Sequence, residues 1–303
     1  MTDAVSIALD AGQTGIKVRV ARAGADPVDH VFPGVRTDVP LLPQLAEVAR
    51  TVAAGSPADV LTAGVSGLTS AEDDPAELRA LVHDLAPARV LLAHDSVTSF
   101  LGTLGDQHGA VVASGTGVVT LAVGPAGVAR VDGWGYLMGD AGSGFWVGRE
   151  ALDAVMRAHD GRGPATSLTA VVQSRWPDLE DAYVQLQSDP ARVSVVAWFA
   201  ETVAAHAATD EVADGICMAA AEELALSVAT ALRRVGTADA NPLVSAIGGV
   251  FRAPAIRGPF EELLRAVHPG VRFEAAHGTG LDGVAALAGL AEGHPLRELV
   301  SEA

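Results

Sequence analysis

The sequence predicts an α/β protein built from two related units. Two segments, VSIALDAGQTGIKVRVARAG (5–24) and GAVVASGTGVVTLAVGPAG (109–127), each have the pattern of a strand, a glycine turn and a second strand. Thr14-Gly15 in the first segment aligns with Thr116-Gly117 in the second. Alternating strands and helices follow, as in α/β proteins. The spacing of about a hundred residues is too long for a solenoid repeat, so we expect two copies of one unit.

The remaining elements are expected in the following order. The pattern predicts a helix in 41–55, a strand entering a loop in 59–69, a helix in 74–86, a strand and helix in 89–105, a long helix in 210–236, a strand, glycine turn and helix in 242–267, and a closing helix in 278–293. We place the domain boundary near Gly105–Gly109. The expected domains are 1–107 and 108–303. An alternative is that the closing helix near 281–293 packs back on the first domain.

Composition excludes several classes of protein. Hydrophobic residues make up 49% of the 303 residues, which argues against disorder. We expect no transmembrane helix and no signal peptide, and therefore a cytoplasmic location. The formal net charge of −17 argues against nucleic acid or an anionic membrane as partner. The charge leaves the oligomeric state open, a homodimer included.

Single residues exclude further kinds of site. Lys17 is the only lysine in the chain, so there is no phosphate loop of the G-x-x-x-x-G-K-[ST] type. Cys217 is the only cysteine, so there is no internal disulfide and no cysteine-built metal site. An anionic ligand must then be held by backbone N–H groups, helix N-termini or a metal ion.

The two glycine turns are candidates for phosphate binding. Asp10 ends the first strand, and the turn that follows can surround a phosphate with backbone N–H groups, with a hydroxyl from Thr14. Asp10 could hold Mg²⁺ through water. Alternatively, the segment is an ordinary hairpin with an aspartate in its turn. The second turn offers Ser114 to Gly117, and the pairing of two such turns favours the phosphate interpretation.

Asp95 lies where a predicted strand meets a predicted helix. Ligands collect at the carboxyl ends of strands in open α/β sheets, and a carboxylate there can accept a proton from a substrate hydroxyl. The alternative is that Asp95 only caps the helix.

Two further glycine motifs are weaker. Gly248-Gly249 lies between a strand and a helix, where it permits close approach of a flat ligand or forms a plain turn. GTGLDG (278–283) matches the dinucleotide fingerprint, but too few residues follow it for the rest of that unit.

The stretch GWGYLMGDAGSGFWVGREAL (133–152) has the composition of a sugar site. Trp134 can stack on the apolar face of a sugar ring, and Asp140 can accept hydrogen bonds from hydroxyl pairs. The glycines allow backbone groups to reach a ligand. A structural loop plugged by aromatic side chains is the alternative.

Together these motifs resemble the BadF/BadG/BcrA/BcrD-type ATPases, and among them the N-acetylglucosamine kinase branch. The resemblance implies two ribonuclease-H-like domains of the actin and hexokinase type around a central cleft. It implies ATP and Mg²⁺ as cofactors and a small sugar as substrate. The residues it assigns are Asp95 as catalytic base and sugar contact; Gly133, Trp134, Gly135, Asp140 and Thr116 for the sugar; Asp10, Gly12, Thr14, Gly115, Thr116, Gly117, Gly249 and Arg252 for ATP; and Asp10 for the metal.

The sequence departs from the family pattern at two places. The first turn contains Ala11 and Gln13 where the family has glycines. Val35 and Arg36 stand where the family has an early asparagine or serine that contacts the sugar. The single cysteine cannot supply the iron–sulfur ligands of the dehydratase-activating branch. The resemblance to the N-acetylglucosamine kinase branch then implies a kinase acting on the 6-hydroxyl of an amino sugar, most simply N-acetylglucosamine. Glucosamine, another hexose, or a non-catalytic sugar or nucleotide sensor remain alternatives.

Overall fold

The computed structural model describes residues 5–12, 14–36, 38–237 and 241–303. The chain forms two compact units, which we call the first and the second unit. The first unit comprises the described residues of Met1–His108 and Ala275–Ala303, and the second those of Gly109–Glu274. Gln13, one of the two residues that depart from the family's first turn, lies outside the described residues.

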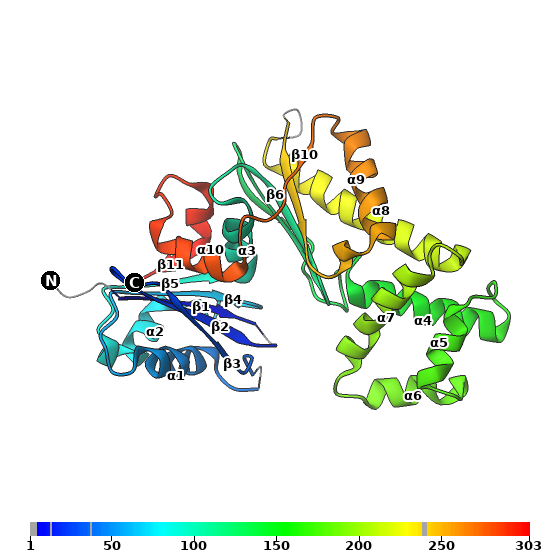
Figure 1. Ribbon diagram of the computed structural model, residues 1–303, viewed down its shortest axis with the longest axis horizontal. Helices are drawn as coiled ribbons and strands as arrows, with labels where there is room; N and C mark the ends of the chain where they lie inside the picture. Colours follow the sequence, from blue (N-terminus) through cyan, green and yellow to red (C-terminus); the bar gives the residue numbers. More distant parts are fainter. Residues whose placement is uncertain (1–4, 13, 37, 238–240) are drawn as a thin grey trace. The chain divides into compact units, whose positions relative to one another are not determined.

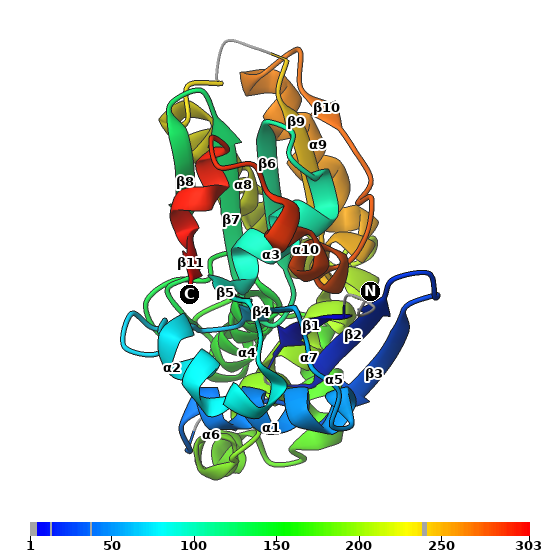
Figure 2. The same cartoon turned by 90° about the vertical axis from the view of Figure 1, so that its left-hand side faces the viewer.

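Apart from the additional edge strand β11, the two sheets share one strand order. The strands of the first unit are β1 (Val5–Ala11), β2 (Ile16–Arg22), β3 (Val28–Phe32), β4 (Val60–Val65), β5 (Arg89–His94) and β11 (Val300–Glu302), in the order β11-β5-β4-β1-β2-β3. Those of the second are β6 (Gly109–Ser114), β7 (Val118–Gly124), β8 (Gly127–Val131), β9 (Leu243–Ile247) and β10 (Arg272–Phe273), in the order β10-β9-β6-β7-β8 (Figure 2). In both, an antiparallel three-stranded meander is extended by parallel strands. The predicted repetition of one α/β unit is therefore confirmed.

Helices cover both faces of the first sheet (Figure 1). They are α1 (Leu41–Ala53), α2 (Pro75–Leu81), α3 (Asp95–Leu104) and α10 (Gly280–Ala286). Helices α1 and α2 lie on one face, and α3 and α10 on the other. The apolar residues of α1 recur at helical spacing, so Leu42, Leu45 and Ala49 are buried against the sheet.

Residues 275–303 belong to the first unit because α10 packs on α3 with almost no space between their backbones. A Cβ at position 102 would lie 1.9 Å from the Thr279 carbonyl oxygen, and one at position 283 would lie 1.8 Å from that of Thr98. Glycine at both positions is therefore what allows the two helices to meet. Strand β11 then pairs antiparallel with β5. The second domain, expected to run over 108–303, thus ends at Glu274 in the structure.

The second unit is mostly helical beyond its first three strands. Its helices are α4 (Gly144–Asp160), α5 (Leu168–Arg175), α6 (Leu179–Ser188), α7 (Arg192–His206), α8 (Glu211–Arg234) and α9 (Pro254–Val267). Helix α8 packs on β6, β7 and β8 and against α9. Among the described residues it is the one helix long and apolar enough to cross a membrane, and it has the buried face of a core helix.

The tight contact between α3 and α10 yields a stability prediction. Gly283→Ala should lower the free energy of unfolding by about 1–3 kcal/mol or more, because the added methyl group collides with backbone rather than with a movable side chain. Chemical denaturation measures the loss. Gly258→Ala is the matched control: position 258 lies in α9 with nothing within 4 Å of the added Cβ, so this change should be neutral or stabilise by about 0.5–1 kcal/mol. Equal effects of both changes would contradict the packing argument.

Candidate active site

The first unit places Asp10 at the carboxyl end of a central strand. Asp10 lies next to Lys17 on β2 and to Gly64 on β4 in the sheet register. The turn that follows closes with a hydrogen bond from the Gly12 N–H to the Gly15 carbonyl (3.0 Å), and the Gly12 carbonyl accepts one from the Val35 N–H (3.0 Å). Thr14, at the tip of this turn, is exposed. Gly12 and Gly15 are thus joined by backbone, and Thr14 is accessible to a ligand.

The surroundings of Asp10 favour binding of a cation. Burial raises the pKa of its carboxyl group, the charge of Lys17 lowers it, and the charge of Asp95 raises it again. Asp10 and Asp95 therefore lie in each other's electrostatic field. The backbone of α10 also approaches, since a Cβ at position 280 would lie 3.2 Å from Asp10 Oδ2.

The donor chemistry fits Mg²⁺ bound largely through water. Among the described residues, no group of three or more histidine, cysteine, aspartate or glutamate side chains could hold a metal ion by itself. Mg²⁺ keeps several of its waters and is commonly bound by one or two carboxylates together with substrate phosphates. Asp10 can supply such a carboxylate, since a bound cation would offset the cost of its ionisation.

Asp95 is not the capping residue of its helix. Strand β5 ends at His94, which occupies the N-cap position of α3, and the Ser96 N–H donates to His94 Nδ1 (3.1 Å). Asp95 Oδ1 lies 2.9 Å from the same nitrogen. One nitrogen cannot accept from Ser96 and donate to Asp95 at once, so the position of the imidazole proton decides which contact is a hydrogen bond. Capping of α3 therefore does not explain the carboxylate of Asp95, whose neighbour in the structure is the His94 imidazole.

In the second unit, the N-terminus of α4 is bound to the second glycine turn. The Gly144 N–H donates to the Gly115 carbonyl (2.7 Å), and the Phe145 N–H to that of Thr116 (3.0 Å). The Ser143 hydroxyl caps the helix by accepting from the Trp146 N–H (3.2 Å). Hydrogen bonds therefore connect the stretch from Gly133 to Leu152 with the turn from Ser114 to Gly117.

Asp140 lies at the junction of the glycine-rich loop and the second turn. Its side chain is only 7% exposed, and its Oδ1 accepts a hydrogen bond from the Gly135 N–H (3.2 Å). A Cβ at position 117 would lie 2.7 Å from Oδ2, so glycine is needed there. Burial and the charge of Asp132 raise the pKa of Asp140, while backbone N–H groups of Gly135 and Val118 act in the opposite direction. Hydrogen-bond donors supplied by a ligand would therefore stabilise the ionised form of this carboxylate.

Asp132 organises the loop, and our sequence analysis missed it. Its Oδ1 accepts hydrogen bonds from the N–H groups of Gly133 and Asp140 (both 2.8 Å), and its Oδ2 accepts from Ala141 (3.0 Å). Asp132 has a φ of 58°, in the left-handed region where aspartate is tolerated better than most residues. The signal in the sequence was an acid directly before a glycine at the start of the loop.

Trp134 is available to a ligand mainly through one ring face. It is 61% exposed, and the guanidinium of Arg130 lies 5.1 Å from its ring centroid. Arg130 also donates to the Gly133 carbonyl (2.8 Å). The indole is thus held by a cation on one side, and the rest of the ring stays accessible for stacking.

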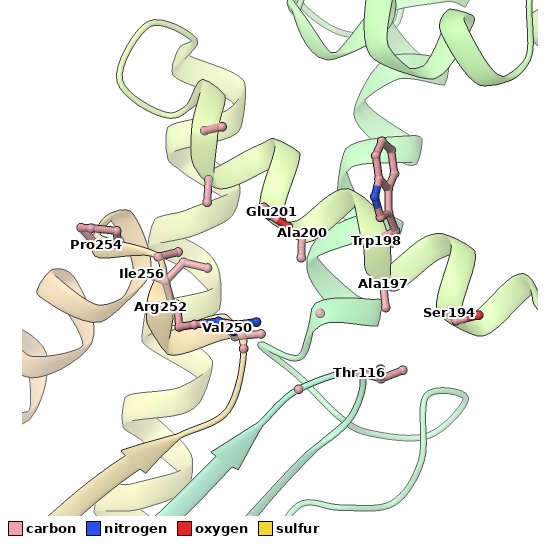
Figure 3. A pocket seen from close by; sticks show the side chains of 16 residues that line it. Thr116, Ser194, Ala197, Trp198, Ala200, Glu201, Val250, Arg252, Pro254 and Ile256 are labelled. Carbon is pink, nitrogen blue, oxygen red and sulfur yellow. The ribbon is translucent and has the colours of Figure 1, made fainter. Parts of the chain in front are cut away.

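A pocket of about 1020 Å³ opens within the second unit beside the second turn (Figure 3). Gly115 and Thr116 line one end, and α7 forms a wall with Trp198 and Glu201. The opposite wall comes from the region of the 3-10 helix η2 (Val250–Arg252) and the start of α9. The volume is that of a typical site for a drug-sized ligand or larger, roughly 300–1000 Å³.

Gly248 and Gly249 serve different purposes. A Cβ at position 248 would lie 2.2 Å from the Ser114 carbonyl oxygen, so this glycine permits a close approach to the second turn and not to a ligand. Gly249 and Arg252 line the pocket. Our interpretation of the pair as a platform for a flat ligand thus needs correction at Gly248.

The candidate residues form three groups. Asp10, Gly12, Thr14 and Asp95 lie in the first unit. Gly115, Thr116, Gly249 and Arg252 line the pocket of the second unit, and Gly133, Trp134, Gly135 and Asp140 form its loop. The second turn joins the last two groups, because Thr116 lines the pocket and the next residue, Gly117, touches Asp140.

Comparison with known proteins identifies the family. The model of the BadF/BadG/BcrA/BcrD ATPase family matches residues 10–283, which include all the candidate residues. The chain belongs to this ATPase family. The resemblance inferred from its motifs is confirmed.

The proteins to which this chain is similar include sugar kinases. An N-acetyl-D-glucosamine kinase from Dictyostelium discoideum is 46% identical over 72 residues, a match that spans 23% of each chain. An N-acetylmuramic acid/N-acetylglucosamine kinase from Clostridium acetobutylicum is 24% identical over 69% of this chain and 70% of its own length. A Chromobacterium violaceum protein assigned as an N-acetylglucosamine kinase has a structure that aligns with a TM-score of 0.68 at 25% identity, covering 93% of this chain and 97% of that one. The predicted fold class, α/β with two sheets of the kind found in these sugar kinases, is confirmed.

The role of Asp132 can be tested without backbone strain. Asp132→Gly tolerates the positive φ but removes three charge-assisted hydrogen bonds, each worth about 1.5–3 kcal/mol and not additive. Amide hydrogen exchange of Gly133, Asp140 and Ala141 should become faster by at least tenfold. Asp132→Asn retains one acceptor oxygen and should give a smaller effect. Unchanged exchange in the glycine variant would show that the loop is held by other contacts.

Proposed function

We propose that this ATPase is a kinase that transfers the γ-phosphoryl group of ATP to the 6-hydroxyl of an amino sugar, with N-acetylglucosamine as the first candidate. The observation that carries the proposal is the second glycine turn. Thr116 lines the nucleotide-sized pocket on one side, and Gly117 contacts the buried carboxylate of Asp140 on the other. Phosphoryl transfer requires the nucleotide phosphates and the accepting hydroxyl to meet at one place.

The pocket is suited to the nucleotide. Small and apolar side chains of Ala197, Ala200, Val250 and Ile256 leave room for a flat base, and Gly115 and Thr116 present backbone at one end. Arg252 supplies a guanidinium whose Nη2 would lie 3.2 Å from a Cβ at position 249. In a chain of net charge −17, a cation at this place favours a phosphorylated ligand.

The loop is suited to the sugar. The carboxylate of Asp140 can accept from two sugar hydroxyls, and Trp134 offers an exposed ring face for stacking. The two curated relatives of this chain are named as kinases of N-acetylated sugars, which supports the choice of substrate. The departure at Val35 and Arg36 bears on this choice. Arg36 is bound to Asp38 by an ion pair (2.7 Å), so its guanidinium is already engaged.

The proposed reaction assigns a proton transfer to Asp95. The sugar 6-hydroxyl oxygen attacks the γ-phosphorus, the bond from that phosphorus to the β–γ bridging oxygen breaks, and ADP leaves. The hydroxyl proton passes to the Asp95 carboxylate, whose position at the end of β5 is that of a ligand-facing group in an α/β sheet. Asp10 would hold Mg²⁺, which when bound supplies charge neutralisation for the phosphates. Backbone N–H groups of the second turn can orient the phosphates.

Release of ADP over a panel of hexoses and hexosamines tests this function. N-acetylglucosamine should be the best substrate, with glucosamine and glucose as the competing candidates. A sensor on the same fold would bind sugar or nucleotide without turnover. The presence at position 95 of a carboxylate that does not cap α3 favours an enzyme over a sensor.

Replacing the base tests the mechanism. Asp95→Asn should lower kcat by about 10²–10⁴-fold while the melting temperature stays close to that of the parent, because His94 and not Asp95 caps α3. Asp106→Asn, which changes an exposed acid of the same unit, is the control and should leave kcat unchanged. If Asp95→Asn turns over within about threefold of the parent, Asp95 is not the base.

Replacing Asp140 separates sugar binding from folding. The pKa of Asp140 is raised in the folded state, so its stabilising contribution is complete below the unfolded pKa and is lost as pH rises through the folded pKa. At neutral pH, Asp140→Asn removes this cost and should maintain or raise the Tm. The sugar KM should nevertheless rise by roughly 10- to 100-fold, with the ATP KM nearly unchanged.

The control for this change is Asp181→Asn, at an exposed position of α6. It should alter neither the Tm nor the sugar KM. A folded Asp140→Asn protein with a normal sugar KM would remove the main support for the sugar site.

A further inference from the structure

Glu201 is the only carboxylate among the described residues that line the pocket of the second unit. The other polar side chains of the lining are Thr116, Ser194, Trp198 and Arg252. Within the described part of the chain, no ion pair or hydrogen bond engages the Glu201 carboxylate. Figure 3 shows its side chain on the α7 wall of the pocket. A carboxylate without a cationic partner is an unusual choice for the wall of a site that binds a polyanion.

Its position along α7 can be measured from the second turn. Ala197 lies at the level of that turn: a Cβ at position 144 would be 3.7 Å from the Ala197 Cβ, and the Gly144 N–H donates to the Gly115 carbonyl. Glu201 follows Ala197 by one helical turn, about 6 Å along the axis. Ala204 and Ala205, which also line the pocket, lie about another turn further on. The pocket therefore passes from the backbone of the turn, past Glu201, to an apolar end.

This order matches the parts of a nucleotide. With the phosphates at the second turn, a carboxylate beside them would be repelled, so Glu201 must face an uncharged part of the ligand. The ribose lies one step away from the phosphates and carries two hydroxyl donors, which a carboxylate can accept together. The apolar end, with Ala204, Ala205 and Ile256, is left for the base.

We propose that Glu201 accepts hydrogen bonds from the ribose 2′- and 3′-hydroxyls, and that it makes this pocket selective for ribonucleotides over deoxyribonucleotides. The inference rests on the nucleotide site of the proposed function, but it does not depend on the identity of the sugar. A site that hydrogen-bonds a hydroxyl group discriminates against the analogue that lacks it, because the carboxylate then loses its donors.

The test measures nucleotide affinity on the full chain without sugar. Isothermal titration with ADP, 2′-deoxy-ADP, 3′-deoxy-ADP and 2′,3′-dideoxy-ADP, in the presence of Mg²⁺, gives four dissociation constants for each protein. The parent should bind ADP roughly 10- to 100-fold more tightly than the dideoxy analogue. In Glu201→Ala, the affinity for ADP should fall by that factor, and the affinity for the dideoxy analogue should be nearly unchanged. The preference for the ribonucleotide then disappears.

Two variants and one further ligand make the result specific. Glu201→Gln keeps an acceptor oxygen and should retain part of the ribose preference. Glu222→Ala, an exposed glutamate on α8 that does not line the pocket, should leave all four constants unchanged. GDP is included because a carboxylate that contacts the base would change the ratio of ADP to GDP affinity.

Several outcomes would overturn the inference. It fails if the parent binds the four adenine nucleotides with equal affinity. It also fails if Glu201→Ala lowers the affinities for ADP and dideoxy-ADP equally. A changed ADP to GDP ratio with an unchanged ribose preference would assign Glu201 to the base instead. If the parent binds no nucleotide, the nucleotide site and the inference fall together. If it binds ADP with the expected preference but phosphorylates no sugar, only the proposed function fails.

Discussion

The close approach of the Asp140 carboxylate to Gly117 is the constraint on which the candidate site of the second unit depends. It can form only because position 117 has no side chain, and it fastens the glycine-rich loop to the turn between β6 and β7. The same turn receives the N-terminus of α4 on its carbonyl groups and the backbone of Gly248 from the end of β9. The loop, the start of α4 and the end of β9 thus all meet at one short turn. Any movement of that turn would shift all of them.

In the first unit, the turn after β1 is held by different contacts. The described residues of this turn are joined by backbone hydrogen bonds, and Asp10, at the base of the turn, has a raised pKa with Asp95 in its electrostatic field. A buried acid with an acidic neighbour is destabilising in the absence of a cation. Under the proposed function, the two units use similar sheets for two electrostatic tasks: the first would favour a cation, and the second would favour hydroxyl groups and a nucleotide.

The fold and much of the site follow from local sequence patterns. The turns of both hairpins, the loop from Gly133 and the strand end before Asp95 are all encoded by residues close together in the chain, so they could be predicted. The roles of His94 and Asp132 could not, because both depend on which backbone N–H groups face the side chain after folding. Glu201 escaped for another reason. It lies on α7, far in sequence from the second turn and from the pocket wall that begins at Gly249, and an exposed glutamate on a helix is ordinary. The edge strands β3 and β8 were missed as well, since their exposed positions lack a clear apolar alternation.

The interruption of the first unit by the second has a consequence for synthesis on the ribosome. Helix α3, with its bare backbone at Gly102, emerges long before the segment that covers it, because all of Gly109–Glu274 is made in between. Until Gly280 and Gly283 arrive, Asp10 lacks the backbone that lies against it, and β5 lacks β11. At about 5–20 residues per second, the nascent chain carries this unfinished sheet for roughly ten seconds or more. The second unit, continuous in sequence, can be complete before the first, so the order of maturation in the cell runs opposite to the order of the units in the chain.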